Sequence, residues 1–149
     1  MGMESRHTYS PAEELDLKMV IALLRTVKAL EAGLAPCFAG WGVTSAQFGV
    51  LEFLYHKGPA RISAIIEKTL SSGGNMTVVV RNLERAGLVR RRRDDKDGRA
   101  ALVELTPRGE KLMSSLFPEH LGVLRRFFSR LGEGDKHAVI GSLKALGGR

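Results

Sequence analysis

Ten charged or turn-forming residues, RRRRDDKDGR, occupy positions 90–99 and place four arginines directly before three aspartates. Carboxylates spaced along a loop are the ligands that Ca²⁺ prefers. Counted from Arg93, four residues fall where an EF-hand loop has its ligands and its glycine: Asp95, Asp97, Gly98 and Glu104. The alternative is a β-hairpin whose charged tip meets a polyanion.

The calcium interpretation fails at two points. The first loop position is Arg93, a cation where the ion needs a carboxylate, and the flanking sequences GLVRRRR and ALVELTP are not helical. As a hairpin, residues 94–98 have turn-forming chemistry, and Gly98 is free to take a positive φ. Asp97 is placed to hold Arg99 or a neighbouring backbone group. Arg99 can then reach into a minor groove, whose negative potential attracts a guanidinium.

The arginine run has two faces, because side chains alternate along a strand. Arg91 and Arg93 share one face, and Arg90 and Arg92 share the other. About half of the run is therefore expected to meet phosphates, and we assign Arg91 and Arg93 to that side.

The sequence NMTVVVRNLERAG, residues 75–87, predicts a helix with one apolar and one polar face. Its apolar stripe contains Met76, Val79, Val80 and Leu83. The opposite face contains Asn75, Thr77, Val78, Arg81, Asn82 and Arg85. Asparagine can read adenine, arginine can read guanine or bind phosphate, and Val78 can meet a thymine methyl. Ser72 and the free N–H groups at the helix start can bind phosphate. An ordinary exposed face would look the same, so the neighbouring hairpin favours DNA.

Signals of enzymatic chemistry are missing from the sequence. The four histidines (His7, His56, His120 and His137) show no metal-binding pairing, and Cys37 is the single cysteine. The sequence contains no G-x-S-x-G elbow and no phosphate-binding P-loop. We expect no enzyme activity, no metal and no cofactor.

The charge distribution indicates a polyanionic partner. The formal net charge is +7 and the isoelectric point is near 10.0. Residues 61–106 carry ten Lys or Arg against six Asp or Glu, and double-stranded DNA fits such a surplus. We find no secretory leader and no apolar run long enough for a membrane span, so we expect a cytoplasmic protein without membrane contact.

Hydrophobic periodicity, caps and breakers predict the elements that position these residues. Helices are expected over 11–34, about 44–57, a brief stretch around Ile65, 74–86, 107–131 and 133–147, with strands over 88–93 and 100–105 and a loop over 33–42. This order describes a mainly α protein with a small β-hairpin wing (α+β). It is a winged helix-turn-helix flanked by N- and C-terminal helices.

The expected organisation is a single domain, residues 1–149. Residues 44–106 form the DNA-binding lobe, and residues 11–34 and 107–149 form a helical dimerisation region. The first helix carries two apolar stripes, a pattern typical of a helix that is buried against both its own domain and another chain.

These residues give the sequence a resemblance to the MarR family of bacterial transcriptional regulators, over about residues 12–147. The most specific part is the wing motif D-x-R followed by L-T-x-x-G, present as residues 97–99 and 105–109. The stretches GLVRR (87–91) and 75–87 are similar to the family's recognition helix and its exit. The residues entering that helix and FPEH (117–120) also resemble the quinone- or phenol-responsive members.

The resemblance implies a homodimer, joined through the terminal helices, that binds a pseudo-palindromic operator as a repressor. It also implies release by a small lipophilic molecule or by thiol oxidation. By similarity, five residues stand where DNA contact or wing shape is decided: Thr77, Arg81, Arg91, Asp97 and Arg99. The sequence departs from the family pattern at Gly98, where many relatives have a second arginine, and at the pair Gly73-Gly74. The operator sequence therefore cannot be carried over.

A regulator of this kind needs a site for its effector. We place a pocket between the first helix, the Cys37–Trp41 segment, the second helix and the long C-terminal helix. Six residues are its candidate lining: Phe38, Trp41, Phe48, Tyr55, His56 and Phe117. Residues of these types are individually more often ordinary core residues, and it is as a set that they indicate a pocket.

Two alternatives to effector control stay open at this point. Cys37 could serve as a redox switch, although its neighbours Pro36 and Phe38 supply no base and a buried thiol acting as a small apolar group is the preferred interpretation. A constitutive architectural DNA-binding protein without an effector is the other alternative.

Overall fold

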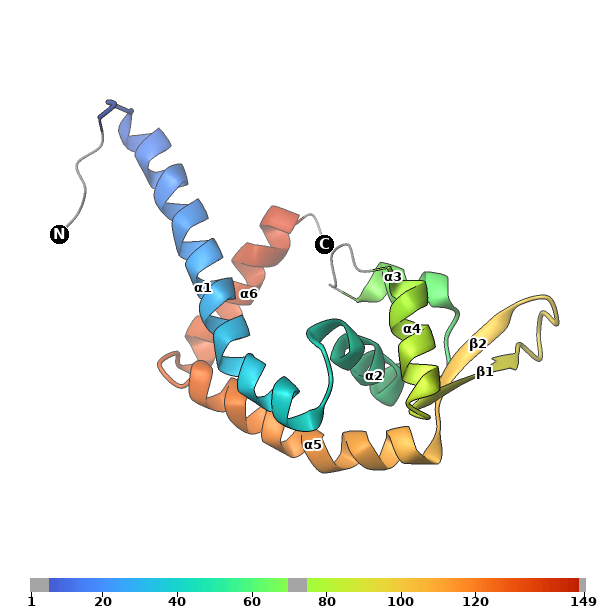
Figure 1. Ribbon diagram of the computed structural model, residues 1–149. Coiled ribbons are helices and arrows are strands. Elements are labelled where there is room, and N and C mark those ends of the chain that lie inside the picture. Colours follow the sequence, from blue (N-terminus) through green and yellow to red (C-terminus); the bar gives the residue numbers. More distant parts are fainter. Residues whose placement is uncertain (1–5, 70–74, 148–149) are drawn as a thin grey trace.

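The computed structural model describes residues 6–69 and 75–147 of the chain (Figure 1). Its elements are α1 (Pro11–Trp41), α2 (Ser45–Lys57), α3 (Ile62–Lys68), α4 (Met76–Arg85), β1 (Val89–Arg93), β2 (Ala101–Leu105), α5 (Pro107–Phe127) and α6 (Glu133–Gly147). The expected fold class is confirmed: the protein is mainly helical, with one two-stranded antiparallel sheet.

The first helix is longer than predicted. The loop expected over residues 33–42 is wrong, because α1 continues through Pro36 to Trp41 and ends at Gly42, whose φ of 70° is left-handed. An internal proline removes one backbone hydrogen bond and disfavours a helix. Here Phe38 and Trp41 pack against the hydrophobic core, and this burial outweighs the local preference for a loop.

The core lies among α2, α4, the sheet and α5. Side chains from each of these contribute to it, and Val50, Leu51, Val80, Val103 and Met113 are almost completely buried. Leu51 and Leu54 lie on α2 after the predicted Thr44 cap, where Gln47 and Thr44 exchange the reciprocal hydrogen bonds of a capping box. This packing fixes α4 relative to the hairpin.

The hairpin pairs β1 with β2 in a register that runs from Val89 opposite Leu105 to Arg93 opposite Ala101. Ala60 adds an isolated bridge to Val103, which ties the segment before α3 to the inner strand. Gly98 lies in the turn, but among the described residues the glycines with positive φ are Gly42, Gly58 and Gly87. The turn therefore does not use the backbone freedom that Gly98 was expected to supply.

A joint made by Thr106 with Gly87, Leu88 and Gly109 connects the segment after α4 to the start of α5. The Thr106 hydroxyl donates to the Gly87 carbonyl at 2.6 Å and accepts from the Gly109 N–H at 3.1 Å. Thr106 N–H also donates to the Leu88 carbonyl at 3.0 Å. A Cβ at position 109 would overlap the Leu88 carbonyl oxygen. The L-T-x-x-G motif is thus explained by packing: threonine links the two elements and glycine lets them approach.

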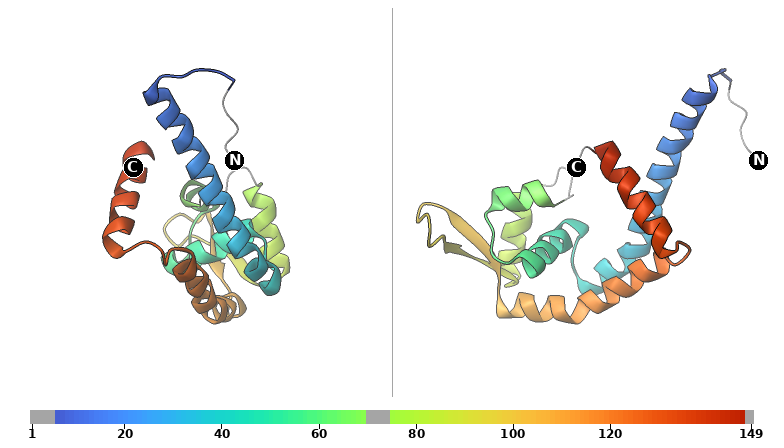
Figure 2. Two further views of the ribbon diagram at one scale, coloured as in Figure 1. Left: turned by 90° about the vertical axis from the view of Figure 1, so that its left-hand side faces the viewer. Right: turned by 180° about the vertical axis from the view of Figure 1, so that it is seen from behind.

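The helices α1 and α6 lie on the opposite side of the molecule from α4 and the wing, where α1 projects outward and α6 turns back from the end of α5 (Figures 1 and 2). We call these two helices the stem. Neither contains a buried residue. Large apolar side chains are nevertheless exposed on both, with Leu24 at 66% and Leu146 at 69% exposure.

Candidate nucleic-acid interface and neighbouring groove

The helix α4 presents the polar face that its sequence predicted. Met76, Val80 and Leu83 are buried, and Val79 packs against the core. The six residues of the opposite face are all exposed: Asn75, Thr77, Val78, Arg81, Asn82 and Arg85. Ser72, the other candidate phosphate ligand, lies outside the described residues. These exposed residues form a polar surface that includes the apolar side chain of Val78. Such a surface is suitable for contacting the edges of bases.

The four arginines of β1 divide as strand alternation predicted. Arg90 and Arg92 both donate to the Glu104 carboxylate, at 3.0 and 3.2 Å, from the same face of the sheet. These two guanidiniums keep the pKa of Glu104 below its usual value against the opposing effect of burial, which is the largest single influence on it. Arg90 and Arg92 are therefore matched by a carboxylate within the protein.

The other two arginines of the run differ from each other. Arg91 donates to Glu84 on α4 at 3.1 Å, so it joins the wing to the candidate recognition helix. Within the part of the chain that the structure describes, the exposed guanidinium of Arg93 has no partner. The two predicted DNA-facing arginines thus have different roles, one linking and one free.

The wing tip is organised by two carboxylates. Asp94 accepts from the Lys96 N–H at 3.0 Å, and Asp97 accepts from the Arg99 N–H at 3.2 Å, as the sequence suggested. The guanidinium of Arg61, from the turn before α3, lies 2.9 Å from Asp94 and 3.5 Å from Asp97. Sequence patterns do not reveal Arg61, because it stands 33 residues from Asp94 and has no motif of its own.

These contacts leave the Arg99 guanidinium exposed at the tip of the wing. The Arg99 side chain is exposed and, among residues 6–69 and 75–147, its guanidinium meets no partner. Both α4 and the hairpin lie at one end of the molecule (Figure 1). A helix with polar, base-reading side chains next to a hairpin with free arginines is a geometry that can place a helix in the major groove and a wing tip in the minor groove.

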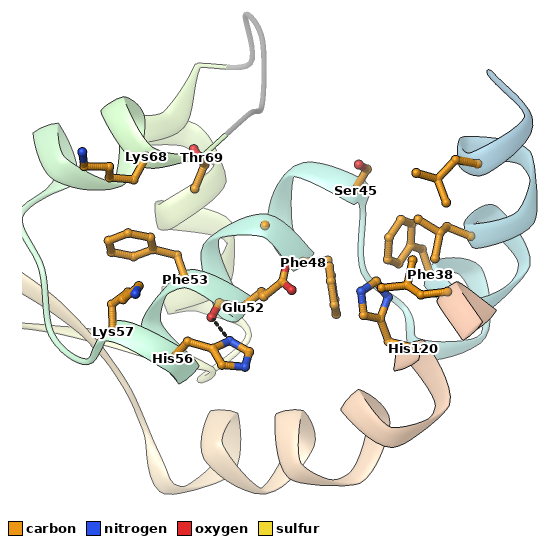
Figure 3. A pocket seen from close by; sticks show the side chains of 14 residues that line it. Phe38, Ser45, Phe48, Glu52, Phe53, His56, Lys57, Lys68, Thr69 and His120 are labelled. Atoms are coloured by element: carbon orange, nitrogen blue, oxygen red, sulfur yellow. Dashed lines mark hydrogen bonds between the residues drawn. The ribbon is translucent and has the colours of Figure 1, made fainter. Parts of the chain in front are cut away.

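A groove of about 690 Å³ separates this lobe from the stem (Figure 3). It is lined by residues of α1, α2, α5 and the end of α3. Of the six predicted lining residues, Phe38, Phe48 and His56 line it. Trp41 instead lines a smaller hollow of about 310 Å³, while Tyr55 and Phe117 are partly buried against the core.

The predicted aromatic residues nevertheless form one connected set. Phe48 contacts Phe38 at a ring-centroid distance of 5.0 Å and His120 at 4.7 Å. Phe117 lies 5.6 Å from His120 and 4.8 Å from His56. The histidine at position 120, which stands out in the sequence only as part of FPEH, is therefore the central member that sequence reasoning missed.

Two residues that line this groove, His120 and Thr69, each have a buried polar atom without a hydrogen-bond partner in the described structure: Nδ1 and Oγ1, respectively. His120 is 6% exposed. Burial lowers its pKa, and the nearby Glu52 carboxylate opposes that effect. The ring is therefore neutral at physiological pH. Its Nδ1 atom donates or accepts a hydrogen bond, depending on the tautomer.

Cys37 lies beside the smaller hollow and faces a carboxylate. Its sulfur is 3.8 Å from Glu119 Oε1, and the Trp41 Nε1–H donates to Glu119 Oε2 at 2.9 Å. Burial and, next, the negative charge of Glu119 raise the pKa of the Cys37 thiol. A protonated thiol is a poor nucleophile, so this environment agrees with a packing role.

Membrane-spanning and metal-binding features are absent from the described residues. Over 6–69 and 75–147, no helix is long and apolar enough to cross a membrane. The same part of the chain has no group of three or more His, Cys, Asp or Glu side chains that could hold a metal ion.

Comparison with known proteins agrees with this geometry. A sequence profile described as MarR family matches residues 41–100. The chain is 31% identical over 134 residues to the HTH-type transcriptional regulator MhqR of Bacillus subtilis (strain 168), a match that covers 90% of this chain and 92% of the relative. The chain belongs to the MarR family. It is thus a DNA-binding transcriptional regulator, and its relatives are not enzymes.

Solved structures of MarR-type regulators share the fold. The crystal structure of transcriptional regulator PA4135 superposes with a TM-score of 0.74 at 27% identity, over 85% of this chain and 93% of that one. The BpsR protein of Bordetella bronchiseptica superposes with a TM-score of 0.76 at 23% identity, over 87% of this chain and 98% of that one. The BpsR structure concerns regulation of its DNA binding by 6-hydroxynicotinic acid.

Proposed function

We propose that this MarR family protein is a cytoplasmic homodimer that binds a pseudo-palindromic operator, represses transcription and is released by a small lipophilic or aromatic effector. The observation that carries the proposal is the pairing of an exposed, base-reading face on α4 with a wing whose Arg93 and Arg99 guanidiniums have no partner among the described residues. Phosphate attraction explains affinity, and the α4 face explains selectivity between sequences.

The stem supports a second copy of this chain as the partner. Apolar side chains are exposed along its two helices: Leu15, Leu17, Met19, Val20, Ile21, Leu23, Leu24 and Val27 on α1, and Val139, Ile140, Leu143 and Leu146 on α6. Large apolar side chains exposed in this number on two helices are typical of an interface. A two-fold dimer would present two copies of α4, as two operator half-sites require.

Fluorescence anisotropy tests DNA binding, with the purified protein, DNA from upstream of its own gene and a scrambled duplex of equal length. We expect selective binding at two protomers per site, with a salt dependence that reflects phosphate contacts. Equal and steeply salt-dependent binding to both duplexes would contradict the proposal. It would favour a constitutive architectural role instead.

The groove supports control by an effector. Aromatic rings line it, and so do His120 and Thr69, each of which has a buried polar atom that lacks a hydrogen-bond partner among the described residues. An apolar site with a few hydrogen-bonding groups is typical of small-molecule binding. A hydroxylated aromatic compound would fill the apolar part and offer a hydrogen-bonding partner to the neutral His120 ring. The compound named as regulating the DNA binding of BpsR, 6-hydroxynicotinic acid, is therefore a suitable first probe.

The effector test uses the same anisotropy assay, with 6-hydroxynicotinic acid and a panel of simple phenols as probes. We expect one of them to raise the apparent Kd for operator DNA, and His120→Phe to reduce that response while leaving DNA affinity without the probe unchanged. Ser45→Ala is the matched control, because Ser45 lines the same groove but is exposed. A response that His120→Phe leaves intact would exclude this anchor.

Control by thiol oxidation is not favoured, since Cys37 faces Glu119 and its pKa is raised. A Cys37→Ser variant is therefore expected to keep the wild-type response to oxidants. Peroxide treatment that releases wild-type protein but not Cys37→Ser protein from DNA would reverse this choice.

A further inference from the structure

Arg61 spans the gap between the helix-turn-helix and the wing tip. Its Nη2 atom lies 2.9 Å from Asp94 Oδ2 and 3.5 Å from Asp97 Oδ2. The Asp94 side chain is only 14% exposed, whereas that of Arg61 is 47% exposed. One guanidinium therefore faces two carboxylates of the turn that joins β1 to β2.

The backbone on either side of Arg61 is fixed. Ala60 exchanges two hydrogen bonds with Val103 of β2, at 3.0 and 2.8 Å, and the Arg61 carbonyl accepts from the Ile65 N–H at 3.1 Å in the first turn of α3. The backbone of Arg61 is thus held firmly in the lobe by hydrogen bonds on both sides. The side chain of Arg61 connects this backbone to the far end of the hairpin.

The two carboxylates also shape the turn that carries Arg99. Asp94 holds the Lys96 N–H, and Asp97 holds the Arg99 N–H. Movement of these carboxylates would therefore move the backbone from which Arg99 projects. Lys96 N–H and then Arg61 are the main reasons why the pKa of Asp94 is lowered, so Asp94 is an anion at neutral pH.

Three aspartates lie at the tip of the wing. Asp95 lies 3.6 Å from Arg92, whereas Asp94 and Asp97 face Arg61. Carboxylates at this place carry an electrostatic cost when the wing approaches a polyanion. The guanidinium of Arg61 offsets the charge of Asp94 and Asp97 at short range. Without it, both the orientation of the tip and its local charge would become unfavourable for a duplex.

We propose that Arg61 is a positioning residue for DNA binding: it anchors the wing tip through Asp94 and Asp97, and it neutralises them so that Arg99 can meet the duplex. This inference rests on the proposed operator binding. A direct contact between Arg61 and a phosphate is the competing explanation, and the two differ in how Arg61 and Arg99 depend on each other.

The experiment measures operator affinity by anisotropy for Arg61→Gln, Arg99→Ala, their double variant, Asp94→Asn, and Arg61→Gln with Asp94→Asn. The Asp94→Asn change keeps a side-chain oxygen that can accept from the Lys96 N–H but removes the charge. Arg130→Gln, which removes an equal charge from an exposed position between α5 and α6, is the matched control.

We expect Arg61→Gln to weaken operator binding about tenfold, as removal of one charge-assisted hydrogen bond does. Arg99→Ala should then cost much less in the Arg61→Gln background than in the wild type. Adding Asp94→Asn to Arg61→Gln should restore part of the affinity, because it removes one unmatched charge but does not replace the lost anchor. Arg130→Gln should bind like the wild type apart from the small effect of net charge.

Independent losses that multiply, with no restoration by Asp94→Asn, would show a direct phosphate contact and overturn the proposal. Wild-type affinity in Arg61→Gln would overturn it as well. Failure of the wild-type protein to discriminate operator from scrambled DNA would instead refute the proposed function.

Hydrogen exchange of the free protein tests the anchor without DNA. The amides of Lys96 and Arg99 should exchange faster in Arg61→Gln than in the wild type, while amides of α4 stay unchanged. Unaltered exchange at these two amides would contradict anchoring whatever the DNA result.

Discussion

The lobe and the stem contain similar apolar side chains, but these side chains are buried in the lobe and exposed in the stem. In the lobe, Leu51, Ile65 and Val80 are fully enclosed by α2, α3, α4 and the sheet. In the stem, Leu24 and Leu146 are among the most exposed large apolar residues of the described chain. Complete burial of one leucine contributes about 1.5–3 kcal/mol. The lobe has already gained this stabilisation, while the stem can gain it only from a further surface.

The strongest test of this contrast introduces charge into the exposed stripe of α1. Leu17→Glu combined with Leu24→Glu should give a monomer by sedimentation and lower operator affinity by about a hundredfold or more, because one lobe then binds without its partner. Thermal unfolding of the lobe should change little, since neither side chain is buried.

Lys18→Glu is the control for that experiment. Lys18 lies on the polar side of α1, where it pairs with Glu14 at 4.0 Å. A dimer that survives the double substitution, or that Lys18→Glu disrupts equally, would show that this stripe is not the interface.

The second test addresses the close packing of the lobe at Gly109. Gly109→Ala should lower the free energy of unfolding by about 1–3 kcal/mol or more, because its Cβ would overlap the Leu88 carbonyl, a backbone atom that cannot turn away. Gly122→Ala, in the same helix, is the control. Its Cβ would meet only the flexible end of Arg126, at 3.7 Å, and alanine favours a helix. Chemical denaturation measures both, and equal effects would contradict the role assigned to the joint.

A smaller difference is expected between two neighbouring arginines of the wing. Arg93→Ala should reduce operator affinity several-fold and lower the slope of log Kd against log salt by about 1 for each phosphate that the variant no longer neutralises. Arg90→Ala should change that slope less, because Glu104 already matches Arg90. A salt series of the anisotropy assay measures both slopes, and identical slopes would show that the internal ion pair does not matter for DNA.

The smallest expected effect is a pH dependence from His120. Burial lowers its folded-state pKa below the ordinary value of 6.5, so the unfolded state binds a proton first as the pH falls. Stability should therefore be highest above about pH 6.5, fall as the pH drops below it, and level off below the folded-state pKa. His120→Phe should remove this slope in urea titrations. His137→Gln, which removes an exposed histidine, should leave it in place.

Local signals in the sequence were sufficient for much of this structure. The Thr44 and Thr106 caps, the apolar stripe of α4 and the alternation along β1 each depend on residues close in the chain, and each was found. The end of α1 was not, because Gly33, Pro36 and Gly40 suggest a loop while the packing of distant elements stabilises a helix.

The candidate site could likewise be predicted only where it depends on residues that are close in the sequence. Exposed side chains of α4 followed from periodicity, but the partners of Arg91 and Arg61 depend on how the chain turns after α4 and before α3. His120 was missed because its importance comes from burial against Phe48 and Phe117 beside one groove, and no local pattern encodes that.

The threonine joint has a mechanical consequence. Thr106 bonds to Gly87 at the end of α4 and to Gly109 in the first turn of α5, with no intervening flexible segment. The long helix α5 therefore acts as a lever that is fixed to α4 at one end and carries the stem at the other. A small tilt of the stem would produce a larger displacement of α4. The stiffness of the contacts made by Thr106 would determine how much of that tilt is transmitted to α4.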